Sequence, residues 1–360
     1  MKKTFASCLV MVLFLYSLLM LSACSNHSAG GSNLNLLGED EKIISISGGD
    51  YMVCALTDQG NCYVAGQSAT EDYNFGLEDY QAYNDYFDLF HPDRFVQIYD
   101  KGDAESISMS YSGGCIITKD HNVYLFLNHS DFDDYATPRL FCSDCVDAQI
   151  GWLDDSISLL RSNGDFGYVP IDSPDDFRLI GKNVSKFKFA TDKNNNTTLF
   201  VLTNNHQLYM FNSEEVLEDQ NDFIEDVIDF DVQSSTGCLV LSIINSDHNA
   251  YHSALEESWC FNRAKIQSNL KLIGSNVSSV VSYDAGTVMK DSDGKVRIYG
   301  SDIKNQFEEA YTGESVFQNK TVKDVCSTYT TLTVLTNDNQ LNRFGYTLND
   351  GVVAITPELR

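Results

Sequence analysis

Apolar and polar residues alternate in short runs along most of this chain, and residues that favour turns separate the runs. Residues 43–66 show the plan: a run rich in Ile and Ser, a Gly-Gly turn, an apolar run, a turn at Gly60, and a return run that ends in Gly66. Alternation with a period of two predicts β-strands, and these runs show no helical period. We therefore expect an all-β chain.

The same plan occurs seven times, and its most regular feature is the residue at the turn before the return run. The seven turn residues are Gly60, His121, Gly164, His206, His248, Gly294 and Asn339. The steps between them are 61, 43, 42, 42, 46 and 45 residues, which gives a period near 45 with one long insertion. Such turns need a positive φ, which Gly adopts freely and Asn or His at modest cost. Turn geometry therefore accounts for three histidines, which are not catalytic candidates.

A fixed period near 45 with several short strands per repeat is typical of a β-propeller. Seven copies predict seven four-stranded antiparallel blades, each too small to bury its faces alone and stabilised by its neighbours. Residues 179–185 and 272–278 support the period, because they differ at one position and lie 93 residues, or two periods, apart. We expect residues 34–360 to form one propeller, in which residues 34–37 and 351–356 meet in the last blade.

The first repeat also carries a resemblance to a known family. Its Ser-Gly-Gly, Cys-Ala-Leu-Thr, Asp-Gln-Gly and Cys-Tyr sequences, between Ser47 and Tyr63, resemble the regulator-of-chromosome-condensation repeat. The sequence of residues 74–77, Asn-Phe-Gly-Leu, is similar to the Gly-Gln-Leu-Gly stretch of that family. The resemblance covers residues 40–347 and implies a seven-bladed propeller of this type. In place of the family's Trp-Gly at the end of the repeat stand Ala65-Gly66, Tyr299-Gly300 and Phe344-Gly345.

The first 23 residues have the features of an export signal. Lys2 and Lys3 precede an apolar run over residues 9–21, which is too short for a lasting transmembrane helix. The sequence Leu-Ser-Ala before Cys24 resembles the bacterial lipoprotein box. That resemblance implies cleavage after residue 23 and lipid, such as palmitate, on Cys24, with residues 24–33 as a flexible tether. We expect an extracytoplasmic protein that is lipid-anchored to the bacterial cell membrane or outer membrane.

The charge balance excludes one class of partner. The chain holds 51 acidic and 24 basic residues and has a formal charge of −27, which becomes −29 once Lys2 and Lys3 are removed. Such a surface repels phosphate backbones and anionic lipid headgroups, so nucleic acid is excluded as the main partner and lipid alone provides the anchor. The nucleotide-exchange function on a nuclear GTPase that the family name implies is therefore not carried over, since a fold does not determine a function.

The sequence offers no convincing catalytic set. A sialidase-type propeller would need a cluster of arginines, whereas the eight arginines here occupy different positions in the repeats. They are Arg94, Arg139, Arg161, Arg178, Arg263, Arg297, Arg343 and Arg360. Adjacent carboxylates are common, but 51 acidic residues produce such pairs by composition alone. We therefore expect a protein that is not an enzyme.

Two further patterns could carry chemistry. Oxygen ligands lie close together in residues 192–196 and 291–293, so weak calcium binding is the one cofactor that we consider, although a calcium loop normally brings more ligands. Cys142 and Cys145 have C-x-x-C spacing, which fits a local disulfide or two thiols, because the second pair of a zinc site is missing. Cys54 and Cys115 both lie six residues before a turn residue and are expected in the core.

The repeat does not explain residues 71–95, which we place as an insertion between blades 1 and 2. Aromatic and acidic residues alternate there, and some of the aromatics have helical spacing. These side chains either pack on the propeller or provide the large, rigid contact area of a binding site. The candidate partner-binding residues are Tyr73, Tyr80, Tyr83, Tyr86 and Phe87.

Our functional hypothesis is non-catalytic recognition of an extracytoplasmic protein by loops on one face of a monomeric propeller. Acidic residues among the aromatics would favour a basic partner. Binding of cell-wall or host glycans is the alternative, followed by an uncharacterised hydrolase or lyase.

Overall fold

The protein was studied as a computed structural model. The chain separates into two compact units, Met1–Leu36 and Leu37–Arg360. The structure describes residues of the second unit only. These are residues 41–49, 52–66, 96–110, 113–127, 137–151, 156–191, 197–212, 217, 223–235, 238–256, 263–283, 286–300, 321–327, 331–339, 341–347 and 351–352.

The described strands form seven antiparallel sheets, five with four strands and two with three. Sheet 1 comprises β1 (Ile43–Gly48), β2 (Met52–Thr57), β3 (Cys62–Gly66) and β4 (Val96–Tyr99). Sheet 2 comprises β5 (Ala104–Ser110), β6 (Gly113–Thr118), β7 (Val123–Leu127) and β8 (Arg139–Cys142). Sheet 3 comprises β9 (Cys145–Ile150), β10 (Ser156–Arg161), β11 (Phe166–Pro170) and β12 (Arg178–Gly181). Sheet 4 comprises β13 (Val184–Thr191), β14 (Thr197–Thr203) and β15 (Leu208–Asn212).

Sheet 5 comprises β16 (Val227–Ser235), β17 (Cys238–Asn245), β18 (Ala250–Glu256) and β19 (Lys271–Gly274). Sheet 6 comprises β20 (Val277–Tyr283), β21 (Gly286–Asp291) and β22 (Val296–Gly300). Sheet 7 comprises β23 (Val322–Ser327), β24 (Thr331–Thr336), β25 (Leu341–Thr347) and β26 (Gly351–Val352). A single short helix, α2 (Arg263–Asn269), precedes β19 in the described residues. Within the same residues, no helix has both the length and the apolar character that crossing a membrane requires.

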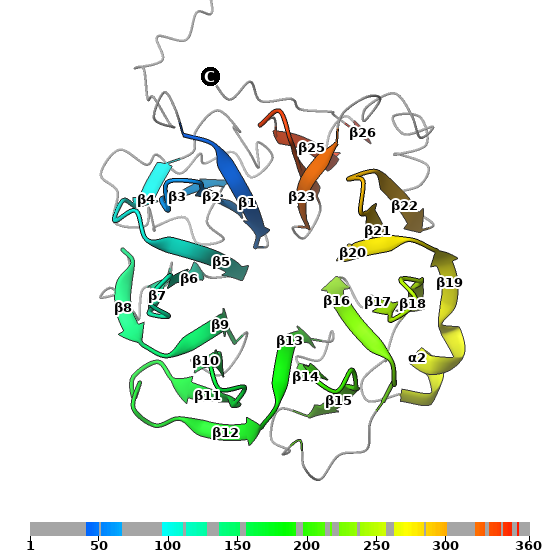
Figure 1. The fold of residues 1–360 in the computed structure, drawn as a ribbon, viewed down its shortest axis with the longest axis horizontal. Helices are drawn as coiled ribbons and strands as arrows, with labels where there is room; N and C mark the ends of the chain where they lie inside the picture. The colour runs from blue at the N-terminus through cyan, green and yellow to red at the C-terminus, as the bar shows by residue number, and fades with distance from the viewer. Residues whose placement is uncertain are drawn as a thin grey trace, which may run out of the picture. The chain divides into compact units, whose positions relative to one another are not determined.

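The sheets are arranged around a central axis, with the first strand of each nearest to it (Figure 1). Each sheet contacts the next one along the chain, and β23 of sheet 7 contacts β1 of sheet 1. This confirms the prediction of an all-β propeller with mainly four-stranded antiparallel blades. Sheets 4 and 6 have three strands within the described residues, although Ile224 forms an isolated bridge to Leu208 beside β15.

The core is divided into layers between the sheets. The second strand of a sheet is covered on both sides by neighbouring sheets, so it is an almost continuous apolar run; all six residues of β2 and of β6 are buried. Six clusters of buried side chains each join two consecutive sheets, from sheets 1 and 2 to sheets 6 and 7. Each sheet therefore needs its neighbours in order to bury its faces.

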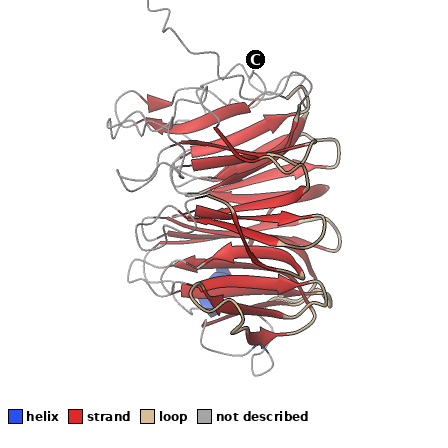
Figure 2. Ribbon diagram, turned by 90° about the vertical axis from the view of Figure 1, so that its left-hand side faces the viewer, coloured by secondary structure: helices blue, strands red, loops and turns tan. Residues whose placement is uncertain are grey.

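One face of the propeller, which we call the turn face, is closed by tight turns. All seven predicted turn residues lie there with a positive φ, between 59° and 84°, as the sequence predicted. In six of them the carbonyl oxygen accepts a hydrogen bond of 2.9–3.1 Å from the first backbone N–H of the next sheet, such as Ala104 N–H to Gly60 O. We call this contact the clasp hydrogen bond. Figure 2 shows the described turns gathered on this side of the strands.

The opposite face is called the connection face. At this face the chain passes from the first strand of each sheet to the second and, in the five four-stranded sheets, from the third strand to the fourth. Residues 71–95 belong to one of these connections, because Val96–Tyr99 pairs with β3 as the fourth strand of sheet 1. Along the chain, residues 71–95 therefore separate the third strand of the first sheet from its fourth. The predicted boundary between blades 1 and 2 was wrong, because the short strand β4 of the first sheet follows the insertion.

Residues 34–37 and 351–356 were predicted to meet in the last blade. Of these two segments, residues 34–37 lie outside the described residues. At the other end, Gly351 and Val352 pair with β25 as the last strand of sheet 7. Within the described residues, every sheet is thus built from one continuous segment of the chain.

Candidate functional site

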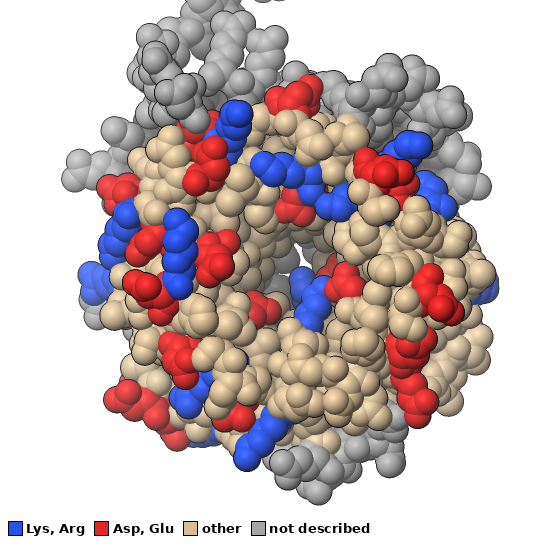
Figure 3. Space-filling view, in the orientation of Figure 1, with Lys and Arg blue, Asp and Glu red and all other residues tan. Residues whose placement is uncertain are grey.

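The central channel is the described region where polar side chains gather. Figure 3 shows the molecule hollowed at its centre, with basic and acidic side chains at the edge of the hollow. The first strand of each sheet lies nearest the central axis (Figure 1), and we call it the inner strand. Every inner strand has a β-bulge at its second residue, so the third and fifth residues occupy equivalent positions in the seven sheets. The third residues are Ser45, Ser106, Asp147, Lys186, Asp229, Ser279 and Asp324. The fifth residues are Ser47, Ser108, Gln149, Lys188, Asp231, Val281 and Cys326.

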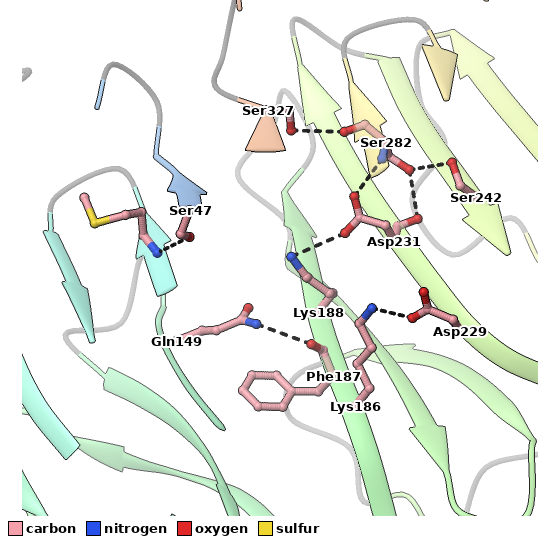
Figure 4. Close-up of polar contacts among 11 residues, drawn as sticks. Ser47, Gln149, Lys186, Phe187, Lys188, Asp229, Asp231, Ser242, Ser282 and Ser327 are labelled. Carbon is pink, nitrogen blue, oxygen red and sulfur yellow. Dashed lines mark hydrogen bonds and ion pairs between the residues drawn. The ribbon is translucent and has the colours of Figure 1, made fainter. Parts of the chain in front are cut away.

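Charged residues at these positions pair across the junction of sheets 4 and 5. Lys186 Nζ lies 2.6 Å from Asp229 Oδ1, and Lys188 Nζ lies 3.3 Å from Asp231 Oδ1 (Figure 4). Asp231 raises the pKa of Lys188 and keeps it charged. Asp147 lies on β9 of sheet 3, on the other side of β13 from Asp231. Burial raises the pKa of the Asp147 carboxyl, and the positive charge of Lys188 lowers it. Five of the six charged residues at these positions thus lie on sheets 3 to 5, and the sixth, Asp324, lies on sheet 7, whereas sheets 1 and 2 contribute serines.

A chain of buried hydrogen bonds runs from Asp231 into the junction of sheets 5 and 6. The Asp231 carboxylate accepts the backbone N–H of Ser282 at 2.7 Å, and its carbonyl oxygen accepts the Ser282 hydroxyl at 2.9 Å. Ser242 Oγ lies 2.7 Å from both Ser282 Oγ and Thr287 Oγ1. Thr287 Oγ1 lies 2.8 Å from His252 Nδ1. Figure 4 shows Ser282 between Asp231 and Ser242.

The directions of these bonds follow from counting protons. A carbonyl oxygen can only accept, so the single proton of Ser282 points to Asp231 and Ser242 must donate to Ser282. Thr287 must then donate to Ser242, and His252 must donate from Nδ1 to Thr287. The chain therefore places the proton of the neutral imidazole on Nδ1.

His252 is buried, and its ring forms a T-shaped contact with the ring of Tyr299 at a centroid distance of 5.1 Å. Burial, together with the nearby charge of Lys271, lowers its pKa to about 4. It is therefore neutral at pH 7. Because Nδ1 carries the proton and donates it to Thr287, this nitrogen does not accept a proton from the hydroxyls of the chain.

Sheets 7 and 1 meet through a separate set of polar contacts. Asp324 Oδ2 accepts the backbone N–H of Ile46 at 2.9 Å and the hydroxyl of Ser45 at 2.8 Å. Asn339 Oδ1 accepts the backbone N–H of Ile43 at 2.8 Å, in place of the carbonyl that forms the other clasp hydrogen bonds. Lys323 Nζ donates to the carbonyl oxygen of Ile43 at 3.0 Å.

The predicted binding residues are not placed by this structure. Cys24, Tyr73, Tyr80, Tyr83, Tyr86 and Phe87 lie outside the described residues, as do residues 192–196 of the calcium hypothesis. At residues 291–293, Asp291 Oδ1 accepts the backbone N–H groups of Asp293 and Lys295 at 3.0 and 2.8 Å, which is a turn contact. Within the described residues, no group of three or more His, Cys, Asp or Glu side chains is placed to hold a metal ion.

The cysteine predictions are resolved in part. Cys54 and Cys115 are fully buried, as predicted, and burial raises the pKa of the Cys54 thiol to about 12. The Sγ atoms of Cys142 and Cys145 lie 3.9 Å apart as two thiols. Sequence reasoning missed the hydroxyl chain, because Ser242, Ser282 and Thr287 come from three strands of two sheets and no short motif joins them.

No protein-family profile matches the sequence, and no curated protein sequence matches it. Solved structures do resemble it. Yeast RCC1 (Prp20), solved bound to Kap60, has a TM-score of 0.55 and 14% identity, over 91% of this chain and 84% of that chain. PorZ, a bacterial surface component of the type-IX secretion system of Porphyromonas gingivalis, has a TM-score of 0.47 and 11% identity. Human WBSCR16 has a TM-score of 0.40 and 12% identity, over 86% of this chain and 78% of that chain.

The match to PorZ covers 88% of this chain but only 38% of PorZ. Identities this low show the fold alone. The fold is thus an all-β propeller whose structural neighbours include RCC1-like propellers.

Proposed function

We propose that this protein is a non-catalytic binding protein that recognises a protein partner through the connection face. The observation that carries this proposal is the division of the two faces. On the turn face, tight turns and clasp hydrogen bonds occupy the strand ends. β3 ends and β4 begins at the connection face, and the chain segment that joins them includes residues 71–95, in which aromatic and acidic residues alternate.

The channel supports a binding role for the face rather than catalysis in the centre. Its described lysines pair with aspartates of the next sheet, and the hydroxyl chain ends on a backbone carbonyl. These groups stabilise the junctions between sheets. A rigid ring that positions loops is a common scaffold for binding sites.

We also infer that the seven sheets are the blades of a seven-bladed propeller of regulator-of-chromosome-condensation type. The period near 45, the repeat of the first sheet and the likeness to yeast RCC1 support this inference.

Affinity capture tests the partner role. The tagged full-length protein is compared with a variant in which Tyr73, Tyr80, Tyr83, Tyr86 and Phe87 are all changed to Ser. A matched control carries Ser at the exposed turn-face residues Asp120, Asn205 and Asp247. We expect the wild type and the control to capture a partner protein that the aromatic variant does not capture. Equal capture by all three, or capture by none, would contradict the proposal. Binding to glycan arrays would then be tested next.

The proposed location is an extracytoplasmic membrane surface, reached through lipid on Cys24. The supporting feature is the sequence Leu-Ser-Ala-Cys at the end of the apolar run. Metabolic labelling with a palmitate analogue tests it: we expect Cys24→Ser to lose the label and Cys8→Ser, in the segment that is removed, to keep it. A label that persists in Cys24→Ser would contradict the assignment.

A further inference from the structure

Cys142 and Cys145 bring two sulfur atoms together at the link between sheets 2 and 3. Cys142 is the last residue of β8, and Cys145 is the first residue of β9. Asp144, with a φ of 65°, reverses the chain between them. The two Sγ atoms lie 3.9 Å apart, and a disulfide needs a separation of about 2.05 Å. Forming the bond therefore requires the two side chains to rotate towards each other.

Cys142 differs in its exposure from the other cysteines whose burial the structure describes. Cys54, Cys62, Cys115 and Cys326 are buried, as is Cys145, whereas Cys142 is partly exposed. An external reagent can therefore reach Cys142 in the folded protein. Cys145 lies directly behind it, in the core between sheets 2 and 3.

The surroundings favour a thiolate at this pair. Contact with the Cys142 thiol, and then the positive charge of Arg161, lower the pKa of the Cys145 thiol. The same contact, and then burial, raise the pKa of the Cys142 thiol, so the first proton of the pair is lost from Cys145. Arg161 is the cross-strand partner of Cys145, and its guanidinium lies 3.9 Å from the centre of the Phe177 ring. The buried Cys54 and Cys62 differ from Cys145 in this respect, since burial raises the pKa of both of their thiols. Thiolates are the form that reacts with disulfides.

We propose that Cys142 and Cys145 are a reactive dithiol that forms a reversible disulfide across the link between sheets 2 and 3. The oxidant is an external disulfide. Cys142 passes its proton to the Cys145 thiolate, attacks one sulfur atom of the external disulfide and releases a first thiol. Cys145 then attacks Cys142 Sγ and releases a second thiol, and its proton leaves with that thiol. Two protein thiols thus become one disulfide while one external disulfide becomes two thiols, so electrons and protons balance. The chemistry is independent of the proposed partner and anchor.

Oxidation of the folded full-length protein with oxidised glutathione tests this proposal. After the reaction, accessible free thiols are alkylated with one reagent, the protein is unfolded, and the remaining free thiols are alkylated with a second reagent of different mass. The protein is then digested, and the masses of the peptides are measured. We expect the peptide with both cysteines to be unalkylated and lighter by two hydrogen atoms, while Cys54 and Cys115 are alkylated only after unfolding. Reduction with dithiothreitol should restore both thiols, and circular dichroism should show the same strand content throughout.

Single variants separate the two roles. Cys145→Ser should accumulate a glutathione adduct on Cys142, because the resolving thiol is missing. Cys142→Ser should show no adduct while the protein is folded, since Cys145 is buried. Two results would overturn the proposal: both thiols remaining free at oxidant concentrations that oxidise a small dithiol, or a wild-type protein that stops at the adduct on Cys142.

A charge variant tests the role of Arg161. Arg161→Gln should slow disulfide formation by up to about tenfold at neutral pH, because it raises the pKa of the pair. Arg139→Gln removes the same charge from the exposed start of β8 and should leave the rate near that of the wild type. Equal rates in both variants would show that Arg161 has no part in the reaction.

Discussion

Residues with a positive φ mark two places in the repeat. The first is the turn that the sequence identified, where Gly, His and Asn alternate because each can adopt the left-handed conformation. The second is the link before an inner strand, where Gly102, Asp144, Asn183, Asp226 and Asn276 also have a positive φ. The near-identical segments around Asn183 and Asn276 contained this second signal, but the other sheets vary too much there for it to be recognised.

At the same scale, His252 predicts a dependence of stability on pH. Its pKa is about 4 in the folded state and about 6.5 in the unfolded state, so the unfolded chain binds more protons between these values. The contribution of neutral His252 is complete above pH 6.5, is lost as the pH falls towards 4, and amounts to about 3 kcal/mol. Chemical denaturation across this range measures it.

The variant His252→Asn keeps an N–H group near the position of Nδ1 and does not titrate. Relative to wild type, its free energy of unfolding should therefore rise as the pH falls from 6.5 to 4. His206→Asn, which removes an exposed turn histidine, should keep the wild-type slope. A parallel profile for His252→Asn would disprove the assignment of the slope to His252.

At the scale of the strand, the bulge at the second residue of every inner strand determines which side chains form the polar positions. The alternating pattern predicted the strands but not the bulge, because an extra residue shifts the alternation by one without an evident signal. Sequence reasoning could therefore recognise Lys186, Asp229 and Asp324 as charged residues in strands but could not bring them to equivalent places. It also missed β4, a four-residue strand that is separated from its repeat by the long insertion.

Asp229 and Asp324 both occupy the third position of an inner strand. We predict that their replacement by Ala lowers the free energy of unfolding by unequal amounts. Asp324 accepts a backbone N–H and a hydroxyl of β1, whereas Asp229 pairs with one partly exposed lysine. Asp324→Ala leaves buried donors without a partner and should lower the free energy of unfolding by about 2–3 kcal/mol. Asp229→Ala should lower it by no more than about 1 kcal/mol. Urea unfolding of both variants measures the difference, and equal losses would refute it.

At the scale of the whole molecule, each described sheet is built from one continuous segment of chain, so a circular permutation need not divide a sheet. We predict that a permutant starting at Gly102 and ending at Lys101, with residues 360 and 34 joined, folds to the same strand content. Its free energy of unfolding should fall by roughly 1–2 kcal/mol, because the junction of sheets 1 and 2 loses its covalent link. Circular dichroism and urea unfolding test this, and a permutant without cooperative unfolding would contradict it.

The composition and the period were sufficient to predict the propeller, since both depend on local patterns that repeat. They could not predict the hydrogen-bonded chain from Asp231 to His252, which depends on how sheets 5 and 6 pack together. The division into a turn face and a connection face also required the strand order, because only the pairing of β4 with β3 shows at which end residues 71–95 leave the sheet.

The contacts of Asn339, Asp324 and Lys323 with β1 have a mechanical consequence. The chain itself runs through the other six junctions, so they stay connected even when their contacts break. The junction between sheets 7 and 1 has no such connection and is the seam of the ring. A force that pulls on the chain before β1 loads this seam directly, and the side-chain oxygens of Asn339 and Asp324 carry part of that load. Under the proposal that lipid on Cys24 holds the protein and that a partner binds it, the strength of the seam would limit the force that the partner can exert before the ring opens.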